Sequence, residues 1–289
     1  MAFQSFQEIL DTCQRDGCLF WEAVAVDDLN EREVSMEESL ASMKRLWKAM
    51  VDASENYEKD RRSNSGLVGG DGGRMREYAK KGKTLGGTFL SEVIAEALCM
   101  GESNACMKRI VAAPTAGACG VLPAVLLPLW RRDQIPEEEI LHALYTAAGI
   151  GQVIAARAYI AGASGGCQAE IGAASAMAAG ALVQLKGGDG QQIIHGAAMA
   201  LKNLLGLVCD PVAGLVEVPC VKRNVGGAAV ALTAADMALA GIKSRIPPDQ
   251  VVDAMKEVGD AMDSRLKETG KGGLAATFYG KSVKISPEM

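Results

Sequence analysis

Apolar residues recur at helical spacing over residues 35–60, near the start of the chain. Ser35 and Glu38 match a capping-box pattern at the beginning of this stretch. Apolar side chains then follow at intervals of three and four: Met36, Leu40, Met43, Trp47 and Met50. This spacing predicts an amphipathic helix. The stripe has two interpretations, contact with the core of its own domain or a docking face for another protein, and we favour the core.

Helical patterns continue through the rest of the chain. Pro136 and the three glutamates after it predict a helix start, with the helix running to about residue 161. Clear alternation of the kind that predicts strands is missing. Further helices are expected over 89–101, 104–113, 169–186, 191–207, 225–241 and 248–267. The predicted fold class is therefore mainly α, a multi-helix domain.

Two segments rich in small residues interrupt these helices. Residues 63–88 read "SNSGLVGGDGGRMREYAKKGKTLGGT", which we expect to form a loop. Its glycines permit backbone amides to turn around an anion, so the loop is either a ligand cradle or a linker. The second segment, "PTAG", lies in a small-residue turn that Pro114 and Pro123 flank. No dinucleotide fingerprint follows a strand, so "GGDGG" alone is weak support for nucleotide binding.

Composition narrows the choice of architecture and partners. The chain is 49% hydrophobic but only 4% aromatic, with 33 glycines, which predicts close helix packing through small residues. Its 30 basic and 35 acidic residues give a formal charge of −5 without a basic block, so we expect no nucleic-acid partner. The start of the chain lacks a signal-peptide pattern, and no apolar run reaches about 18 residues. We therefore expect a cytoplasmic protein without a membrane partner.

The eight cysteines and two histidines are the candidates for metal or redox chemistry. A reducing compartment argues against disulfides, and thiol packing explains the cysteines in helical or local segments: Cys13, Cys18, Cys99 and Cys106. Three others lie where regular structure breaks, which leaves metal binding and packing both open: Cys167, Cys209 and Cys220. His142 is expected in the core or an interface. For His195, at a helix start, a structural and a functional role both remain open.

Five motifs together resemble the alpha subunit, or alpha domain, of the bacterial iron-sulfur L-serine dehydratases. They span roughly residues 60–277 in the order found in that family. The motifs are "NSGLVGGDGG" (64–73), "IVAAPTAGACGVLPAVL" (110–126), "SGGCQAEIGAASAMAAG" (164–180), "HGAAMALKNLLGLVCDPVAGLVEVPCVKRN" (195–224) and "GGLAAT" (272–277). The resemblance implies conversion of L-serine to pyruvate and ammonia without pyridoxal phosphate.

The resemblance also implies a cofactor and a set of site residues. Three cysteines would hold a 4Fe-4S cluster whose remaining iron acts as a Lewis acid: Cys167, Cys209 and Cys220. The glycine-rich loop and the "PTAG" turn would bind the substrate through Ser65, Gly66, Asp71, Thr115, Ala116 and Gly117. Asp71 would face the substrate ammonium. Alternatively, Thr115 and Gly117 only shape a turn.

His195 is the candidate catalytic histidine, and the base would otherwise come from the beta subunit that the family possesses. We interpret residues 1–289 as one serine dehydratase alpha-type catalytic domain. It comprises a polar helical segment (1–60), a cluster- and substrate-binding core (61–277) and a tail (278–289). Two other functions remain open: a cysteine desulfidase of the related cluster-binding family, and a non-catalytic helical scaffold.

Overall fold

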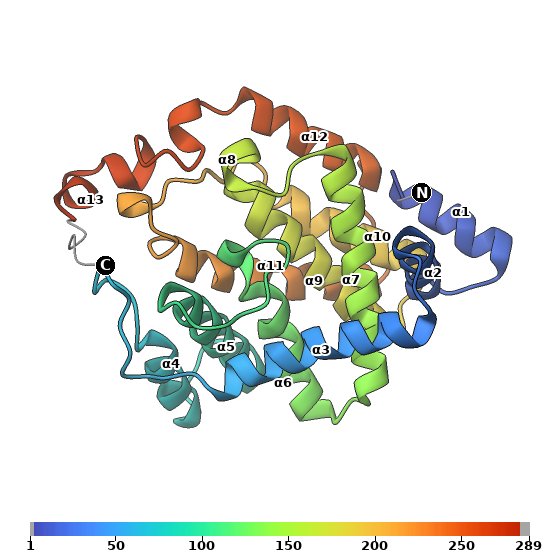
Figure 1. Ribbon diagram of the computed structural model, residues 1–289, viewed down its shortest axis with the longest axis horizontal. Coiled ribbons are helices and arrows are strands. Elements are labelled where there is room, and N and C mark those ends of the chain that lie inside the picture. The colour runs from blue at the N-terminus through green and yellow to red at the C-terminus, as the bar shows by residue number, and fades with distance from the viewer. Residues whose placement is uncertain (1–2, 284–289) are drawn as a thin grey trace.

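The computed structural model describes residues 3–283 and confirms a mainly α fold (Figure 1). Within these residues there is no β-strand, and a single parallel bridge pairs Cys209 with Lys267. The predicted tail is described as far as residue 283, and its residues 284–289 lie outside the described part. The α-helices are α1 (Phe6–Asp16), α2 (Phe20–Arg32), α3 (Met36–Glu55), α4 (Asp71–Lys80), α5 (Gly87–Ala105), α6 (Val121–Asp133), α7 (Glu137–Arg157), α8 (Gly162–Gly165), α9 (Ala173–Leu185), α10 (Gly190–Lys202), α11 (Cys220–Leu239), α12 (Pro248–Ala261) and α13 (Phe278–Ser282).

The core is built around α9, which packs against α6, α7, α10 and α11 (Figure 1). Small residues let these helices approach closely, as composition predicts. The Ser175 hydroxyl on α9 donates a 2.7 Å hydrogen bond to the backbone carbonyl of Gly227 on α11. A Cβ at Gly227 would lie 3.0 Å from Ser175 Oγ on α9 and 2.8 Å from Ile171 Cγ2 just before α9, so any larger residue there would push the two helices apart.

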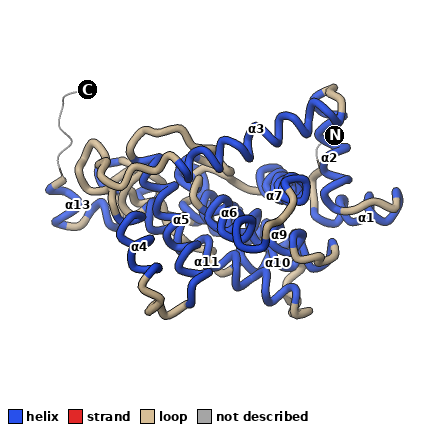
Figure 2. Tube along the Cα trace, turned by 90° about the horizontal axis from the view of Figure 1, so that it is seen from below, coloured by secondary structure: helices blue, strands red, loops and turns tan. Residues whose placement is uncertain are grey.

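The predicted amphipathic helix forms as α3, a long helix at the periphery of the molecule (Figure 2). Ser35 caps it as expected: its backbone amide donates to Glu38 Oε2 at 2.8 Å, and its hydroxyl accepts from the Glu38 amide at 3.3 Å. Trp47 and Met50 are buried, and Trp47 packs edge-on against Trp130 with 5.4 Å between ring centroids. The stripe therefore serves the protein's own core.

Two expectations about the segment 63–113 are wrong. Residues 71–80 form helix α4 inside the expected loop, and residues 106–113 are not helical. Helix α5 ends because Met107 adopts a left-handed φ of 59° and the Lys108 amide donates back to the Ser103 carbonyl at 2.9 Å. Pro123, the second proline that flanks the "PTAG" segment, lies in the first turn of α6, where a backbone N–H has no helical partner to lose.

In the stretch 3–283, every helix falls short of the length or the apolar character needed to cross a membrane.

Candidate active site

The structure brings the three singled-out cysteines into one buried region from three distant parts of the chain. Cys167 precedes a π-helical turn, η2 (Gln168–Gly172), that leads into α9, and Cys220 is the first residue of α11. Cys209 follows α10 and bridges to Lys267 through its backbone. The three side chains are buried, with exposed fractions of 2%, 3% and 8% for residues 167, 209 and 220.

Burial governs the acidity of these thiols. It raises the pKa of Cys167 to about 11 and that of Cys220 to about 12, and it raises the pKa of Cys209 as well. A negative charge on Cys167 further raises the pKa of Cys209 and of Cys220, which shows that the thiols are close enough to repel one another as thiolates. The Arg223 guanidinium opposes this effect at Cys167. The three cysteines therefore stay protonated until a cation binds beside them.

Buried thiols are the donor type by which proteins hold an iron-sulfur cluster. Across residues 3–283, no three side chains of the types His, Cys, Asp and Glu are gathered tightly enough to hold one metal ion. A cluster makes a different demand, because its thiolates bind separate iron atoms. Cys167 and Cys220 also lie at helical N-termini, where the backbone dipole stabilises a thiolate.

Arg223 supports this region from α11. Its guanidinium donates to the Val208 carbonyl at 2.7 Å and to Asp210 Oδ1 at 2.8 Å. Asp210 is buried, and its second oxygen accepts from the Leu274 amide at 2.7 Å. The "GGLAAT" segment is thereby tied to the segment that carries Cys209.

Glu170 is a site residue that sequence reasoning missed. It lies in η2, three residues after Cys167, and its Oε1 accepts a 2.6 Å hydrogen bond from the Thr115 hydroxyl. Its Oε2 lies 4.0 Å from Cys209 Sγ. Burial raises the pKa of Glu170, and the Thr115 hydrogen bond opposes the rise. The available signal was a single charged residue within an alanine-rich stretch of small side chains, "CQAEIGAAS".

A glycine makes room for this contact. A Cβ at Gly162 would lie 2.7 Å from Glu170 Oε2 and 2.8 Å from Cys209 Sγ, so even alanine would collide with both groups. Gly117 borders the same carboxylate, since a Cβ there would lie 3.2 Å from Glu170 Oε1. The space between the "PTAG" turn and the cysteines therefore requires glycine at positions 117 and 162.

The "PTAG" turn is anchored to the helix that begins with Cys220. Asn224 on α11 donates to the Gly117 carbonyl at 2.8 Å and accepts from the Gly120 amide at 2.8 Å. Ala116 opens a 3-10 turn, η1 (Ala116–Ala118). Thr115 and Gly117 therefore do shape a turn, and the same turn presents Thr115 to Glu170.

The glycine-rich loop reaches the neighbourhood through a buried carboxylate, Glu217. The hydroxyls of Ser63 and Ser65 both donate to Glu217 Oε2, the first at 2.8 Å. Glu217 precedes Cys220 by three residues, and its neighbour Val216 lies beside Gly117. Ser65 is thus linked to the cysteine region. Gly66, next to it, has a φ of 76°, which favours glycine.

Asp71 and His195 have other surroundings. Asp71 begins α4, and its two oxygens pair with Arg74 at 2.8 Å and Lys222 at 3.0 Å. Burial lowers the pKa of His195, and the charged groups that influence this pKa are Lys243, Asp189 and Lys202. None of these belongs to the cysteine region, and the buried Nδ1 of His195 lacks a hydrogen-bond partner in the described part of the chain. Gly196, next to His195 on α10, lies against Ala238 near the end of α11, whereas Cys220 begins that helix, so the structure does not bring His195 together with the cysteines.

His142 has the surroundings expected of a core or interface residue. Its ring stacks on Trp21 at 3.7 Å between centroids, with an interplanar angle of 11°. Glu138 and Glu139, one turn earlier on α7, lie within 4.0 Å of its two nitrogens.

Comparison with known proteins agrees with these motifs. A family model described as the serine dehydratase alpha chain matches residues 15–275. The chain is 43% identical to a probable L-serine dehydratase alpha chain of Bacillus subtilis over 98% of its own length and 94% of that protein. It is 42% identical to an L-serine dehydratase alpha chain of Peptoniphilus asaccharolyticus, over 96% of both chains. It is 35% identical to the L-serine dehydratase TdcG of Escherichia coli, covering 94% of this chain and 61% of the relative. The chain belongs to the serine dehydratase alpha chain family.

Proposed function

We propose that this chain is the alpha subunit of an L-serine dehydratase, a lyase that converts L-serine to pyruvate and ammonia. Family membership and the names of the relatives support the reaction. The observation that carries the proposal is that three buried cysteines from separate segments lie in one region, in which Glu170 contacts both Cys209 and Thr115 of the "PTAG" turn. A non-catalytic scaffold would not need buried carboxylates and thiols at one point.

The cluster of the proposed enzyme is a 4Fe-4S group held by Cys167, Cys209 and Cys220. When bound, it supplies a Lewis acid that stabilises the negative charge on the departing hydroxyl oxygen. The chain's own contribution is a set of buried thiols with the Arg223 guanidinium beside Cys167. This guanidinium favours the charged form of Cys167, so it assists the deprotonation that binding requires.

Substrate recognition is proposed at the "PTAG" turn and the glycine-rich loop. The first amides of the 3-10 turn Ala116–Ala118 are not used by the turn itself, so they are suited to a carboxylate. Of the two nearby carboxylates, Asp71 already pairs with two cations, whereas Glu170 holds only the Thr115 hydroxyl and the Cys209 thiol. Glu170 is therefore the stronger partner for the substrate ammonium. Loss of the α-proton and hydroxide yields aminoacrylate, which tautomerises and hydrolyses.

We propose that a beta subunit completes the enzyme and supplies the base that removes the α-proton. Two relatives of similar length are named alpha chains. The chain covers only 61% of TdcG, whose name does not call it an alpha chain. The surroundings of His195 favour a base from elsewhere. We also propose a cytoplasmic location, where thiols remain reduced.

The test is anaerobic co-expression with a candidate beta subunit, followed by measurement of iron, sulfide and pyruvate formation from L-serine. We expect iron and sulfide together with pyruvate, and loss of activity on exposure to air. A folded complex without iron and without pyruvate formation would refute the proposal. Activity with L-cysteine but none with L-serine would favour the desulfidase.

Two variants separate the candidate ammonium partners. Glu170→Gln should raise the serine KM strongly, and Asp71→Asn should raise it less, with iron content unchanged in Asp71→Asn. The reverse order would assign the ammonium to Asp71.

A further inference from the structure

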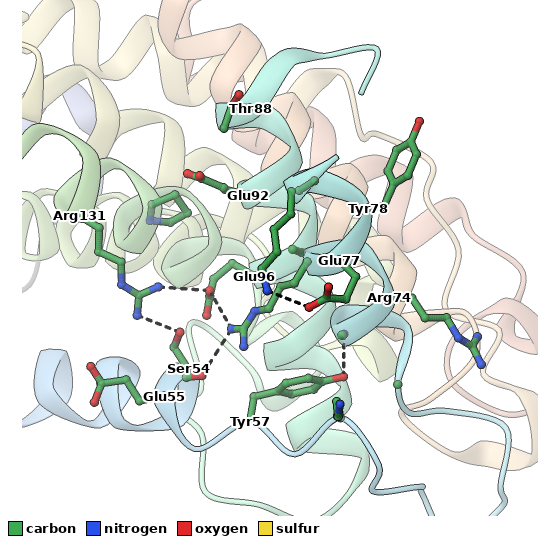
Figure 3. Close-up of a pocket in the computed structure, with 18 of the residues that line it drawn as sticks. Ser54, Glu55, Tyr57, Arg74, Glu77, Tyr78, Thr88, Glu92, Glu96 and Arg131 are labelled. Carbon is green, nitrogen blue, oxygen red and sulfur yellow. Dashed lines mark hydrogen bonds and ion pairs between the residues drawn. The ribbon is translucent and has the colours of Figure 1, made fainter. Parts of the chain in front are cut away.

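An open cleft with a volume of about 1360 Å³ lies between the end of α3 and helices α4, α5 and α6 (Figure 3). None of the cysteines or "PTAG" residues lines it. Eight of its lining side chains are Lys or Arg and five are Asp or Glu, whereas acidic residues outnumber basic ones in the whole chain. The cleft is therefore a locally cationic region of an acidic protein.

Two arginines in the cleft share a single carboxylate oxygen. Glu96 Oε2 accepts from Arg76 at 3.3 Å and from Arg131 at 3.5 Å, and Figure 3 shows the Arg131 guanidinium facing the Glu96 carboxylate. The Glu96 side chain is 5% exposed, and its Oε1 has no partner among the described residues. Two cations facing one anion leave a net positive charge in a partly buried place, where water screens it poorly.

The guanidinium groups also retain unused donors. Besides Glu96, Arg131 bonds the Ser54 hydroxyl at 3.1 Å and Arg76 reaches the Ser54 carbonyl at 3.5 Å. These contacts and the two to Glu96 leave several of the five N–H donors of each group unspent. The two side chains are 36% and 41% exposed, so the remaining donors are open to the cleft.

The neighbouring residues hold the two arginines in place. The Arg76 guanidinium lies over the Tyr57 ring, 5.2 Å from its centroid, which fixes one face of the group. Its distance to Glu96 exceeds the roughly 2.7–2.9 Å typical of a charge-assisted hydrogen bond. The two guanidinium groups are thus held in place while some of their N–H donors remain unused, which suits a site that binds a second anion.

We infer that this cleft binds a small oxyanion, bearing carboxylate or phosphate groups, at Arg76 and Arg131. The planar fork of each guanidinium matches both chemistries. An anion bound there joins α4 to α6, because Arg76 belongs to the first helix and Arg131 to the second. The site is distinct from the proposed substrate site.

The test is isothermal titration of the full chain with citrate and, separately, with inorganic phosphate at constant ionic strength in chloride. The two probes distinguish a carboxylate ligand from a phosphate ligand. We expect saturable binding of one of them, unchanged by excess L-serine. Absence of saturable binding for both probes, or their displacement by L-serine, overturns the inference.

Variants locate the binding. Arg131→Lys keeps the charge but loses the fork, and should weaken binding by roughly tenfold. Arg45→Gln is the matched control, since Arg45 is an exposed arginine on α3 outside the cleft, and should bind as the wild type does. Wild-type affinity in Arg131→Lys refutes the assignment.

Lys81→Gln is a second test variant in case Arg131→Lys does not fold. Lys81 lines the cleft and its side chain is exposed. Removing its charge should weaken binding severalfold and lower the dependence on salt. If Arg131→Lys does not fold, unchanged affinity and salt dependence in Lys81→Gln overturn the inference. Because the titration needs neither iron nor turnover, its result is independent of the proposed reaction.

Discussion

A buried carboxylate, Glu102, holds the start of α4 and with it the glycine-rich loop. Its Oε1 accepts from the Asp71 amide at 2.7 Å, and its Oε2 accepts from the Gly72 amide at 3.1 Å and the Tyr57 hydroxyl at 2.5 Å. The residue is 2% exposed, and the N-cap of α4 is a glycine with no side chain to offer. Glu102 on α5 therefore accepts the hydrogen bonds of the Asp71 and Gly72 amides, which the N-cap glycine cannot accept.

Replacing Glu102 with Gln tests this role at nearly constant volume. The amide retains one acceptor oxygen and turns an NH2 group toward at least one of the three donors. Each hydrogen bond to a charged group contributes about 1.5–3 kcal/mol, and the helix N-terminus adds about 0.3–1 kcal/mol. Removing a buried charge offsets part of the loss because the neutral amide costs less to desolvate. We expect a net destabilisation of about 2 kcal/mol.

Urea unfolding followed by far-ultraviolet circular dichroism measures the loss. Glu92→Gln is the control, because Glu92 is exposed on the same helix, and its effect should stay within about 0.5 kcal/mol. Hydrogen exchange of the Asp71 and Gly72 amides should quicken in the Glu102 variant before global unfolding. Equal stability of the two variants, with unchanged exchange at these amides, would refute the reasoning.

Three further predictions concern the site. Changing any one of the three cluster cysteines to Ser should lower the amount of bound iron and the rate of pyruvate formation. Cys106→Ser is the buried control and should change neither. Iron analysis after anaerobic purification tests this prediction. Thr115→Val should raise the serine KM by roughly tenfold, because the Thr115 hydroxyl favours the charged form of Glu170, which is the form that pairs with an ammonium. Thr115→Ser should restore the KM, and steady-state kinetics would contradict this if both variants behaved alike. The iron-free chain should lose stability as pH rises above 9, since unfolded thiols ionise near 9.0 whereas folded Cys167 keeps its proton to about 11. Thermal unfolding across this range should show a smaller decline in Cys167→Ala, and an equal decline would exclude this thiol as a cause.

Local signals predicted the helices whose determinants are local. The Ser35–Glu38 box and the stripe after it specify α3 without distant help, and Pro136 with its glutamates specifies the start of α7. Helix α4 was missed because glycines at its first turn disfavour a helix, and the group that compensates, Glu102, lies 31 residues from Asp71 in the sequence. Residues 106–113 failed as a helix because a left-handed Met107 ends α5, which composition does not reveal.

The same difference between local and distant determinants decides which site residues the sequence could predict. Breaks in regular structure singled out Cys167, Cys209 and Cys220, and the family resemblance gave them a role. Glu170 and Glu217 were missed because their partners are far away in sequence, Thr115 at 55 residues and Ser63 at 154. A single sequence shows that a carboxylate stands in an apolar stretch, but not which hydroxyl satisfies it.

The position of the cysteines at helix starts explains how thiols far apart in sequence come to share a region. Cys167 leads into η2 and α9, and Cys220 opens α11, and these two helices pack against each other along small residues. Their close packing therefore places two N-termini, and two thiols, side by side. Cys209 is added by the chain that returns from α10 and pairs with Lys267. A larger residue at Gly227 would push α11 away from Ile171 and Ser175, and should therefore weaken iron binding.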